Sequence, residues 1–111
     1  MIGNDIVDLL QAEKDSNWNR KGYLDKIFTD EEQFLISSDM YPNLMVWLLW
    51  SMKESAYKIS SRATKLRTFA PIRLRCNNLI IHDGKATGNV LYEDKMYFTE
   101  TVFNDNYVHT T

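Results

Sequence analysis

The stretch WSMKESAYK, residues 50–58, combines one carboxylate with two ammonium groups and two aromatic rings. Glu54 is a hard oxygen ligand of the kind that Mg²⁺ prefers, or a base that accepts a proton, and Lys53 and Lys58 carry the positive charge needed beside phosphates. Glu54 and Lys58 also have the i,i+4 spacing of an ordinary helical ion pair, which contributes only about 0.2–0.5 kcal/mol. The residue types alone therefore leave two interpretations open: a metal and phosphate site, or a second packing surface of a helix.

Asp5 is the second candidate ligand. It lies in an apolar N-terminal segment, where a buried carboxylate without a partner is costly. Asp5 either binds a turn or joins Glu54 around a hard cation such as Mg²⁺. We expect His82 and His109 to be surface or packing residues, because the sequence has no histidine metal motif, Ser-His-Asp order or Gly-rich phosphate loop.

The composition is that of a globular protein. With 111 residues, 44% of them hydrophobic and 25% charged, the chain is long enough for one modest core, and we predict a single domain over residues 1–111. The lone cysteine, Cys76, is predicted to lie in the core, and the absence of any disulfide partner favours a reducing, cytoplasmic setting. The start MIGNDIVDLL lacks a basic region and the apolar run LMVWLLW is far too short to span a bilayer, so we expect no membrane partner.

The net charge of -2 hides an asymmetry along the chain. Between Lys53 and Arg75 there are seven Lys or Arg residues and a single acid, whereas nine of the fifteen acids lie in residues 1–39. The basic segment either faces phosphates or an acidic partner, or it is a solvated surface balanced by the acidic part of the chain. The negative overall charge and the lack of a recognised module argue against nucleic-acid binding.

The first half of the chain predicts one short strand and several helices. We expect a strand over residues 1–7, then a helix from Leu9 to about Lys14 capped by Asp8, and a turn-rich connection in which Gly22 ends a helix. A second helix in FTDEEQFLISS is predicted to begin at a cap formed by Thr29 or Asp30.

A long helix is predicted from about Leu44 to Arg62, after a break at Pro42. One stripe of this helix is apolar and should face the core: Met45, Leu48, Leu49, Met52, Ala56 and Ile59. The opposite face gathers Trp47, Trp50, Glu54, Tyr57 and Lys58, with Lys53 at its edge. Because a solvated face seldom exposes so many large aromatic residues, we expect this helix to contact something on both sides.

The second half predicts short antiparallel strands. PIRLRC alternates apolar and basic residues, Asp83-Gly84 is a hairpin turn between two apolar runs, and NDN separates MYFTETVF from YVHTT. The predicted class is therefore α+β: a short N-terminal strand, helices, and one long helix packed on an antiparallel β meander.

These segments together resemble the 4'-phosphopantetheinyl transferase superfamily. The family's G-x-D strand matches GNDIVDL, with Gly3 and Asp5, and its helix W/F-x-x-K-E-[AS]-x-x-K matches WSMKESAYK. The order and separation also match, as does the closing hairpin YFTETVFNDNYVHTT. The chain looks like the half-domain with the K-E helix of the surfactin-synthetase-activating type, and like the short holo-acyl-carrier-protein synthase type.

The resemblance implies transfer of the 4'-phosphopantetheine arm of coenzyme A to a serine of an acyl or peptidyl carrier protein. By position, Asp5 and Glu54 would bind Mg²⁺, and Glu54 would help to deprotonate the serine. Lys58 would neutralise pyrophosphate charge, Lys53 would hold phosphate or orient the helix, and Arg62 would join them in binding coenzyme A.

Two departures from the family pattern shape the expected assembly. Val7 stands where larger members often have a third acid, although Asp8 follows it, and no Ser-His element of the SISH kind is present. Family members build the active site between two α+β halves, and this chain matches only the half with the K-E helix. We therefore expect a homo-oligomer (dimer or trimer) or a complementary half. The alternative function is a catalytically silent member of the fold that acts as a dimerisation or binding module.

Overall fold

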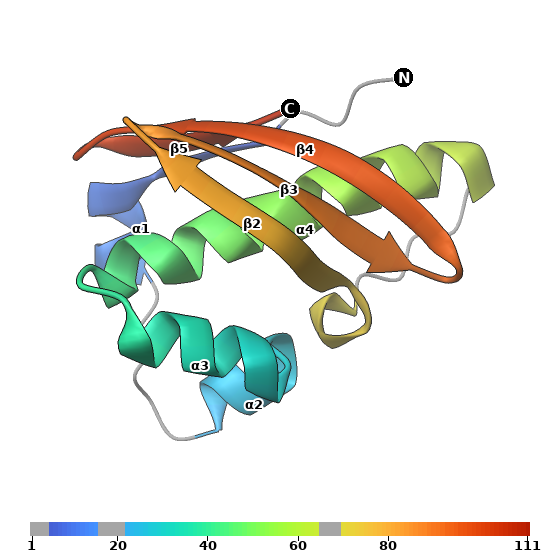
Figure 1. Cartoon of the computed structure of the whole chain (residues 1–111), viewed down its shortest axis with the longest axis horizontal. Coiled ribbons are helices and arrows are strands. Elements are labelled where there is room, and N and C mark those ends of the chain that lie inside the picture. The colour runs from blue at the N-terminus through green and yellow to red at the C-terminus, as the bar shows by residue number, and fades with distance from the viewer. Residues whose placement is uncertain (1–4, 16–21, 65–69) are drawn as a thin grey trace.

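A five-stranded antiparallel sheet covers one side of a long helix, and shorter helices lie on the other side (Figure 1). The computed structural model describes residues 5–15, 22–64 and 70–111. The strands follow the order β1-β5-β4-β3-β2, and the long helix α4 contacts both the sheet and helix α3. The predicted α+β class, with a long helix packed on a β meander, is confirmed.

The N-terminal strand and the helix after it match their predicted order. Strand β1 spans Asp5–Asp8 and helix α1 spans Leu9–Asp15. The carboxylate of Asp8 accepts a hydrogen bond from the backbone N–H of Gln11 at 3.0 Å, which is the predicted helix cap. Gly3 and most of the predicted turn-rich connection lie outside the described residues.

Gly22 lies directly before a helix. It is the N-cap of helix α2, Tyr23–Ile27, and its φ of +82° is in the left-handed region that glycine adopts without strain. The residues just before it, 16–21, lie outside the described residues, so a helix that ends at Gly22 stays a prediction. Gly22 therefore takes a backbone conformation that favours glycine, and glycine in this conformation can occur at either end of a helix.

Helix α3, Asp30–Ser38, begins with a complete capping box. The Thr29 side chain accepts a hydrogen bond from the Glu32 N–H, and the Glu32 carboxylate accepts one from the Thr29 N–H at 2.8 Å. Of the two caps expected for α3, Thr29 is the one observed.

Helix α4 spans Pro42–Thr64 and starts at its proline, which suits a first helical position because proline has no N–H to leave unpaired.

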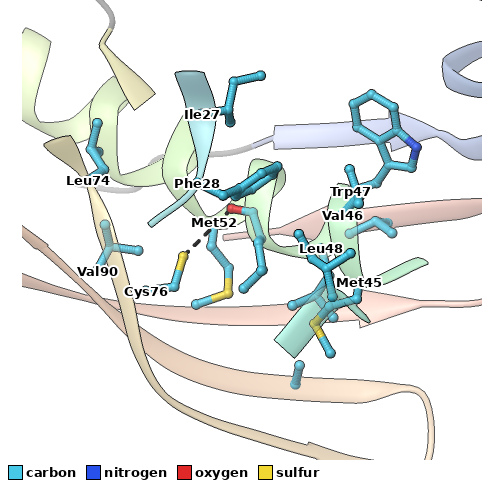
Figure 2. Packing of buried hydrophobic residues seen from close by; sticks show 14 of the residues in the cluster. Ile27, Phe28, Met45, Val46, Trp47, Leu48, Met52, Leu74, Cys76 and Val90 are labelled. Carbon is cyan, nitrogen blue, oxygen red and sulfur yellow. Dashed lines mark hydrogen bonds between the residues drawn. The ribbon is translucent and has the colours of Figure 1, made fainter. Parts of the chain in front are cut away.

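Helix α4 is buried on nearly all sides, which confirms that it contacts structure on both faces. Ile59 of the predicted apolar stripe is half-buried, and the other five residues are at most 5% exposed: Met45, Leu48, Leu49, Met52 and Ala56. Trp47, predicted on the opposite face, is also in the core with 5% exposure (Figure 2). No helix within the described ranges is long and apolar enough to cross a membrane.

The remaining four strands form the predicted meander. Strands β2 (Arg75–His82) and β3 (Lys85–Tyr92) are joined at Asp83-Gly84, whose φ values of +48° and +74° suit a tight two-residue hairpin. Strands β4 (Lys95–Phe103) and β5 (Tyr107–Thr110) complete it. Gly88 of β3 lies against α4, since a Cβ there would come within 2.8 Å of the Met52 methyl group.

The strand predicted in PIRLRC begins later than expected. Pro71–Arg73 forms a short 3₁₀ turn, η1, in which the Leu74 N–H bonds to the Pro71 carbonyl, and β2 starts at Arg75. Ile72, which the alternation groups with Leu74 and Cys76, is 38% exposed, whereas Leu74 and Cys76 are buried, Cys76 as predicted. Proline favours the first position of such a turn because its φ is already fixed, and this preference overrides the alternation of apolar residues.

The pairing of β1 with β5 brings the two ends of the described chain together. Asp5 lies opposite Thr110 and Val7 opposite Val108, and both β1 residues face α4. The topology therefore places Asp5 over the long helix that carries Glu54 and Lys58.

Candidate functional site

Asp5 and Lys58 meet although 53 positions separate them in the sequence. The Lys58 ammonium lies 3.0 Å from Asp5 Oδ1, and the two side chains are 38% and 12% exposed. The ion pair is therefore open to solvent on the lysine side and mostly enclosed on the aspartate side. Such a partly open position suits a charged ligand that enters from solvent.

Glu54 lies one helical turn before Lys58 and is half-buried. Burial raises the pKa of Glu54 above its usual value, the negative charge of Asp5 raises that pKa further, and Lys58 partly opposes the change. The two carboxylates are thus near enough to repel each other. A cation placed between them would relieve this repulsion.

One oxygen of Asp5 is left without a partner. Asp5 Oδ2 is buried and accepts no hydrogen bond from the residues that the structure describes, whereas Oδ1 is paired with Lys58. An unsatisfied buried carboxylate oxygen is costly unless something else fills its place. A hard cation fits this position, because carboxylate oxygens are the ligands that Mg²⁺ prefers.

The cluster offers few protein ligands for a metal ion. Across residues 5–15, 22–64 and 70–111, no group of three or more His, Cys, Asp or Glu side chains is arranged to hold a metal. Asp8 cannot supply a third ligand in this arrangement, since strand alternation turns it away from Asp5 and its carboxylate caps α1. Mg²⁺ tolerates such a site because it commonly keeps several waters and binds one or two carboxylates together with substrate phosphates.

Lys53 lies on a different face of α4 from this cluster. Its side chain is fully buried, and its ammonium donates hydrogen bonds to Glu32 Oε1 at 2.7 Å, to the Ile27 carbonyl at 2.7 Å and to the Pro71 carbonyl at 2.9 Å. Because an ammonium group has three protons, this geometry leaves none for a phosphate. Of the two roles expected of Lys53, this placement fits the one of orienting the helix and offers no proton for a phosphate contact.

Arg62 is exposed and lies one turn beyond Lys58 on the same face of α4. Its guanidinium group suits phosphate oxygens, which accept two parallel hydrogen bonds from it. A phosphate contact by Arg62 stays a prediction, as do the roles of Lys58, Glu54 and Asp5.

Glu32 is the residue whose importance the sequence did not reveal. Its side chain is 1% exposed, Oε1 accepts from Lys53 and from the Thr29 N–H, and Oε2 accepts from the Cys76 N–H at 2.7 Å. The T-x-x-E capping-box pattern in TDEE was the available signal, but it does not predict a buried lysine partner. Glu32 thereby joins α3, α4 and β2.

Cys76 and His82 have the structural roles expected of them. Cys76 is buried, its thiol approaches the Leu49 carbonyl at 3.8 Å (dashed line in Figure 2), and burial raises its pKa well above the usual value, with Glu32 adding to the effect. His82 is exposed beside Asp83 at the hairpin turn. Neither side chain belongs to the cluster around Asp5.

The comparison with family models assigns the chain to a family. The model of the 4'-phosphopantetheinyl transferase superfamily matches residues 1–111, and the chain belongs to this superfamily. The comparison with curated proteins gives no match. The class of reaction associated with the fold is therefore transfer of a phosphopantetheine group.

Proposed function

We propose that this chain transfers the 4'-phosphopantetheine arm of coenzyme A to a serine hydroxyl of an acyl or peptidyl carrier protein, in a reaction that depends on Mg²⁺. The products are the holo-carrier protein and 3',5'-ADP. The observation that carries this proposal is the convergence of Asp5, Glu54 and Lys58, with one buried Asp5 oxygen unpaired within the described structure. Membership of the superfamily supplies the class of reaction.

Asp5 and Glu54 are the residues that would hold Mg²⁺. When bound, the ion supplies charge neutralisation and orientation of the coenzyme A pyrophosphate. Two protein carboxylates leave most coordination positions to water and phosphate oxygens, which matches the usual binding of Mg²⁺ to phosphate substrates.

The residues of the chain account for the proton and charge movements of the transfer. Glu54, directly or through a water, accepts the proton of the carrier serine, and its raised pKa makes it a stronger base than an ordinary glutamate. The serine oxygen then bonds to the phosphorus that carries the pantetheine arm, and the bond from that phosphorus to the 3',5'-ADP oxygen breaks. Lys58 stabilises the charge that develops on the departing phosphate, and Arg62 holds phosphate nearby.

The outer face of the sheet supports the expected homo-oligomer or complementary half. Strand alternation places Ile6, Met96, Phe98 and Val102 on the face that points away from α4, with exposures of 64%, 49%, 78% and 48%. The free face of an antiparallel sheet is normally polar, and a large apolar patch marks an interaction site. We propose that this face packs against another copy of the chain (dimer or trimer) or against a complementary half. A cytoplasmic setting stays a prediction.

The alternative is a catalytically silent binding module. The helix face predicted to gather Trp47, Trp50 and Tyr57 would suit such a module, but Trp47 is buried and packs edge-on against Trp50, with ring centroids 6.4 Å apart. The apolar outer face of the sheet remains available to such a module.

Intact mass spectrometry of the carrier protein separates the two functions. The purified chain is mixed with coenzyme A, MgCl₂ and apo-carrier proteins, and the mass increase from one phosphopantetheine group is followed. We expect wild type and the exposed control Glu31→Gln to modify the carrier, whereas Glu54→Gln and Asp5→Asn do not. If wild type and Glu54→Gln are equally inactive, transfer by this chain alone is ruled out. Dimerisation without coenzyme A binding would then favour the module.

A further inference from the structure

A chain of three buried hydroxyl groups lies between helix α4 and the sheet. Ser51 Oγ donates a hydrogen bond to Thr110 Oγ1 at 2.8 Å, and Thr110 Oγ1 lies 2.8 Å from Thr101 Oγ1. Each of the three side chains is at most 1% exposed. They come from α4, β5 and β4, so the chain joins the helix to two adjacent strands.

The hydroxyl chain adjoins the carboxylate cluster from two sides. In the sheet register Asp5 lies opposite Thr110 and Thr110 opposite Thr101, so the three side chains form a row on the face that meets α4. Directly opposed residues of neighbouring strands have Cβ atoms about 4.5–5.5 Å apart, which is within reach of a rotated hydroxyl group. On the helix, Ser51 lies one turn before Glu54.

The direction of the hydrogen bonds among the three hydroxyl groups follows from the number of protons that each can donate. A threonine hydroxyl has one proton to donate and can accept two hydrogen bonds, and Thr110 already accepts one from Ser51. The nearby Asp5 Oδ2 receives no hydrogen bond within the described structure, so the Thr110 proton is not directed at it. The 2.8 Å contact between Thr101 and Thr110 allows either oxygen to donate, and donation from Thr110 to Thr101 is the direction that gives the Thr110 proton an acceptor.

We propose that Thr101 and Thr110 are positioning residues for the cation site: Thr101 holds the Thr110 proton, which keeps Asp5 Oδ2 free to bind a divalent cation. This inference rests on the proposed function, because it assigns a role toward the same Mg²⁺ site. Without the acceptor at position 101, the Thr110 hydroxyl can turn to the unsatisfied Oδ2 of Asp5, the residue opposite it in β1, and compete with the cation for that oxygen.

Mg²⁺ affinity measured on four proteins tests this proposal. MgCl₂ is titrated into wild type, Thr101→Val, Thr110→Val and the double variant, and the amide resonances of Asp5 and Glu54 report the dissociation constant without need of turnover. We expect Thr101→Val to bind about tenfold more weakly, the effect of one hydrogen bond to a charged group. Thr110→Val should bind within about twofold of wild type, because no hydroxyl is left to compete. The double variant should recover the affinity lost by Thr101→Val.

The recovered Mg²⁺ affinity of the double variant distinguishes competition between the Thr110 hydroxyl and the cation from a general structural effect of the substitution. Thr101→Ser, which keeps the hydroxyl, serves as the conservative control and should bind as wild type does. A Thr101→Val protein with wild-type affinity, or a double variant as weak as Thr101→Val, overturns this inference and leaves the proposed function intact. A wild-type protein that shows no Mg²⁺ response at Asp5 and Glu54 overturns the metal role of both residues, and the inference with it.

Discussion

Two lysines on different faces of helix α4 each pair with a carboxylate from another element, and the two pairs differ in exposure and in hydrogen bonding. Lys53 and Glu32 are 0% and 1% exposed, and their charged atoms have a complete set of hydrogen bonds. Lys58 and Asp5 are partly open to solvent, and the aspartate keeps an unpaired oxygen beside a second carboxylate. The complete pair can only stabilise the fold, whereas the incomplete pair can bind something else.

This difference explains why neighbouring residues of one motif have separate roles. Lys53 and Glu54 are adjacent in sequence, yet the helix turns them toward different surroundings, about 100° apart. The network of Lys53 fixes α4 against Ile27, Glu32 and Pro71. With the helix fixed in this way, Glu54 and Lys58 are held toward β1.

The largest expected effect is on the complete pair. Glu32→Gln keeps the shape of the side chain but leaves the buried Lys53 charge without a counter-ion, and we expect the free energy of unfolding to fall by about 3–5 kcal/mol. Urea denaturation measures the change. Glu31→Gln, at an exposed neighbouring position, should change stability by less than about 0.5 kcal/mol.

A second variant keeps this prediction testable if Glu32→Gln does not fold. Glu32→Gln combined with Lys53→Met removes both charges, and we expect it to recover most of the lost stability, because a buried pair replaced as a unit is far less costly than a broken one. Equal stability of wild type and Glu32→Gln would contradict the structural role given to this pair.

The next largest effect is on the chemistry of the incomplete pair. Asp5→Asn removes the charge that would hold Mg²⁺, and we expect the rate of phosphopantetheine transfer to fall by at least about 100-fold, the scale on which groups that activate a reaction contribute. Carrier modification is followed by intact mass, and stability by urea. A variant that loses stability as severely as Glu32→Gln would show that Asp5 has mainly a structural role.

A smaller effect on stability is expected at Lys58. Because this lysine is 38% exposed, Lys58→Gln should lower the free energy of unfolding by no more than about 1 kcal/mol, the usual range for ion pairs near the surface. Transfer should nevertheless decrease, since charge neutralisation of the phosphate is lost. A stability loss of several kcal/mol would remove the contrast with Lys53.

The smallest effect concerns pH and the metal-free protein. The pKa of Glu54 is raised in the fold, so its contribution to stability is fully present below the ordinary value of 4.5 and is lost as pH rises through the folded-state pKa. Glu54→Gln should therefore be slightly more stable than wild type at neutral pH, and the difference should vanish in acid. Unfolding measured at several pH values without Mg²⁺ tests the sign. A difference that grows toward low pH would contradict it.

The sequence predicted the local features well because short-range rules determine them. The Asp8 cap, the Thr29 cap and the Asp83-Gly84 turn each depend on a few consecutive residues. The predicted start of the PIRLRC strand was wrong because the preference of Pro71 for the first position of a turn overrode the alternating pattern.

The roles of the charged residues depend on contacts that no local rule gives. Lys53 reaches Glu32 across 21 positions, and Lys58 reaches Asp5 across 53 because β1 pairs with β5. The sequence therefore predicted which residues carry charge in the motif. It did not show which lysine is enclosed and which one is open.

The most direct test compares the two pairs in one assay of Mg²⁺-dependent phosphopantetheine transfer, with unfolding measured on the same preparations. The account predicts that Asp5→Asn is folded but inactive, and that Glu32→Gln combined with Lys53→Met is folded and still modifies the carrier protein. The opposite result, an active Asp5→Asn and a folded but inactive double variant, would contradict the assignment of chemistry to one face of α4 and stability to the other.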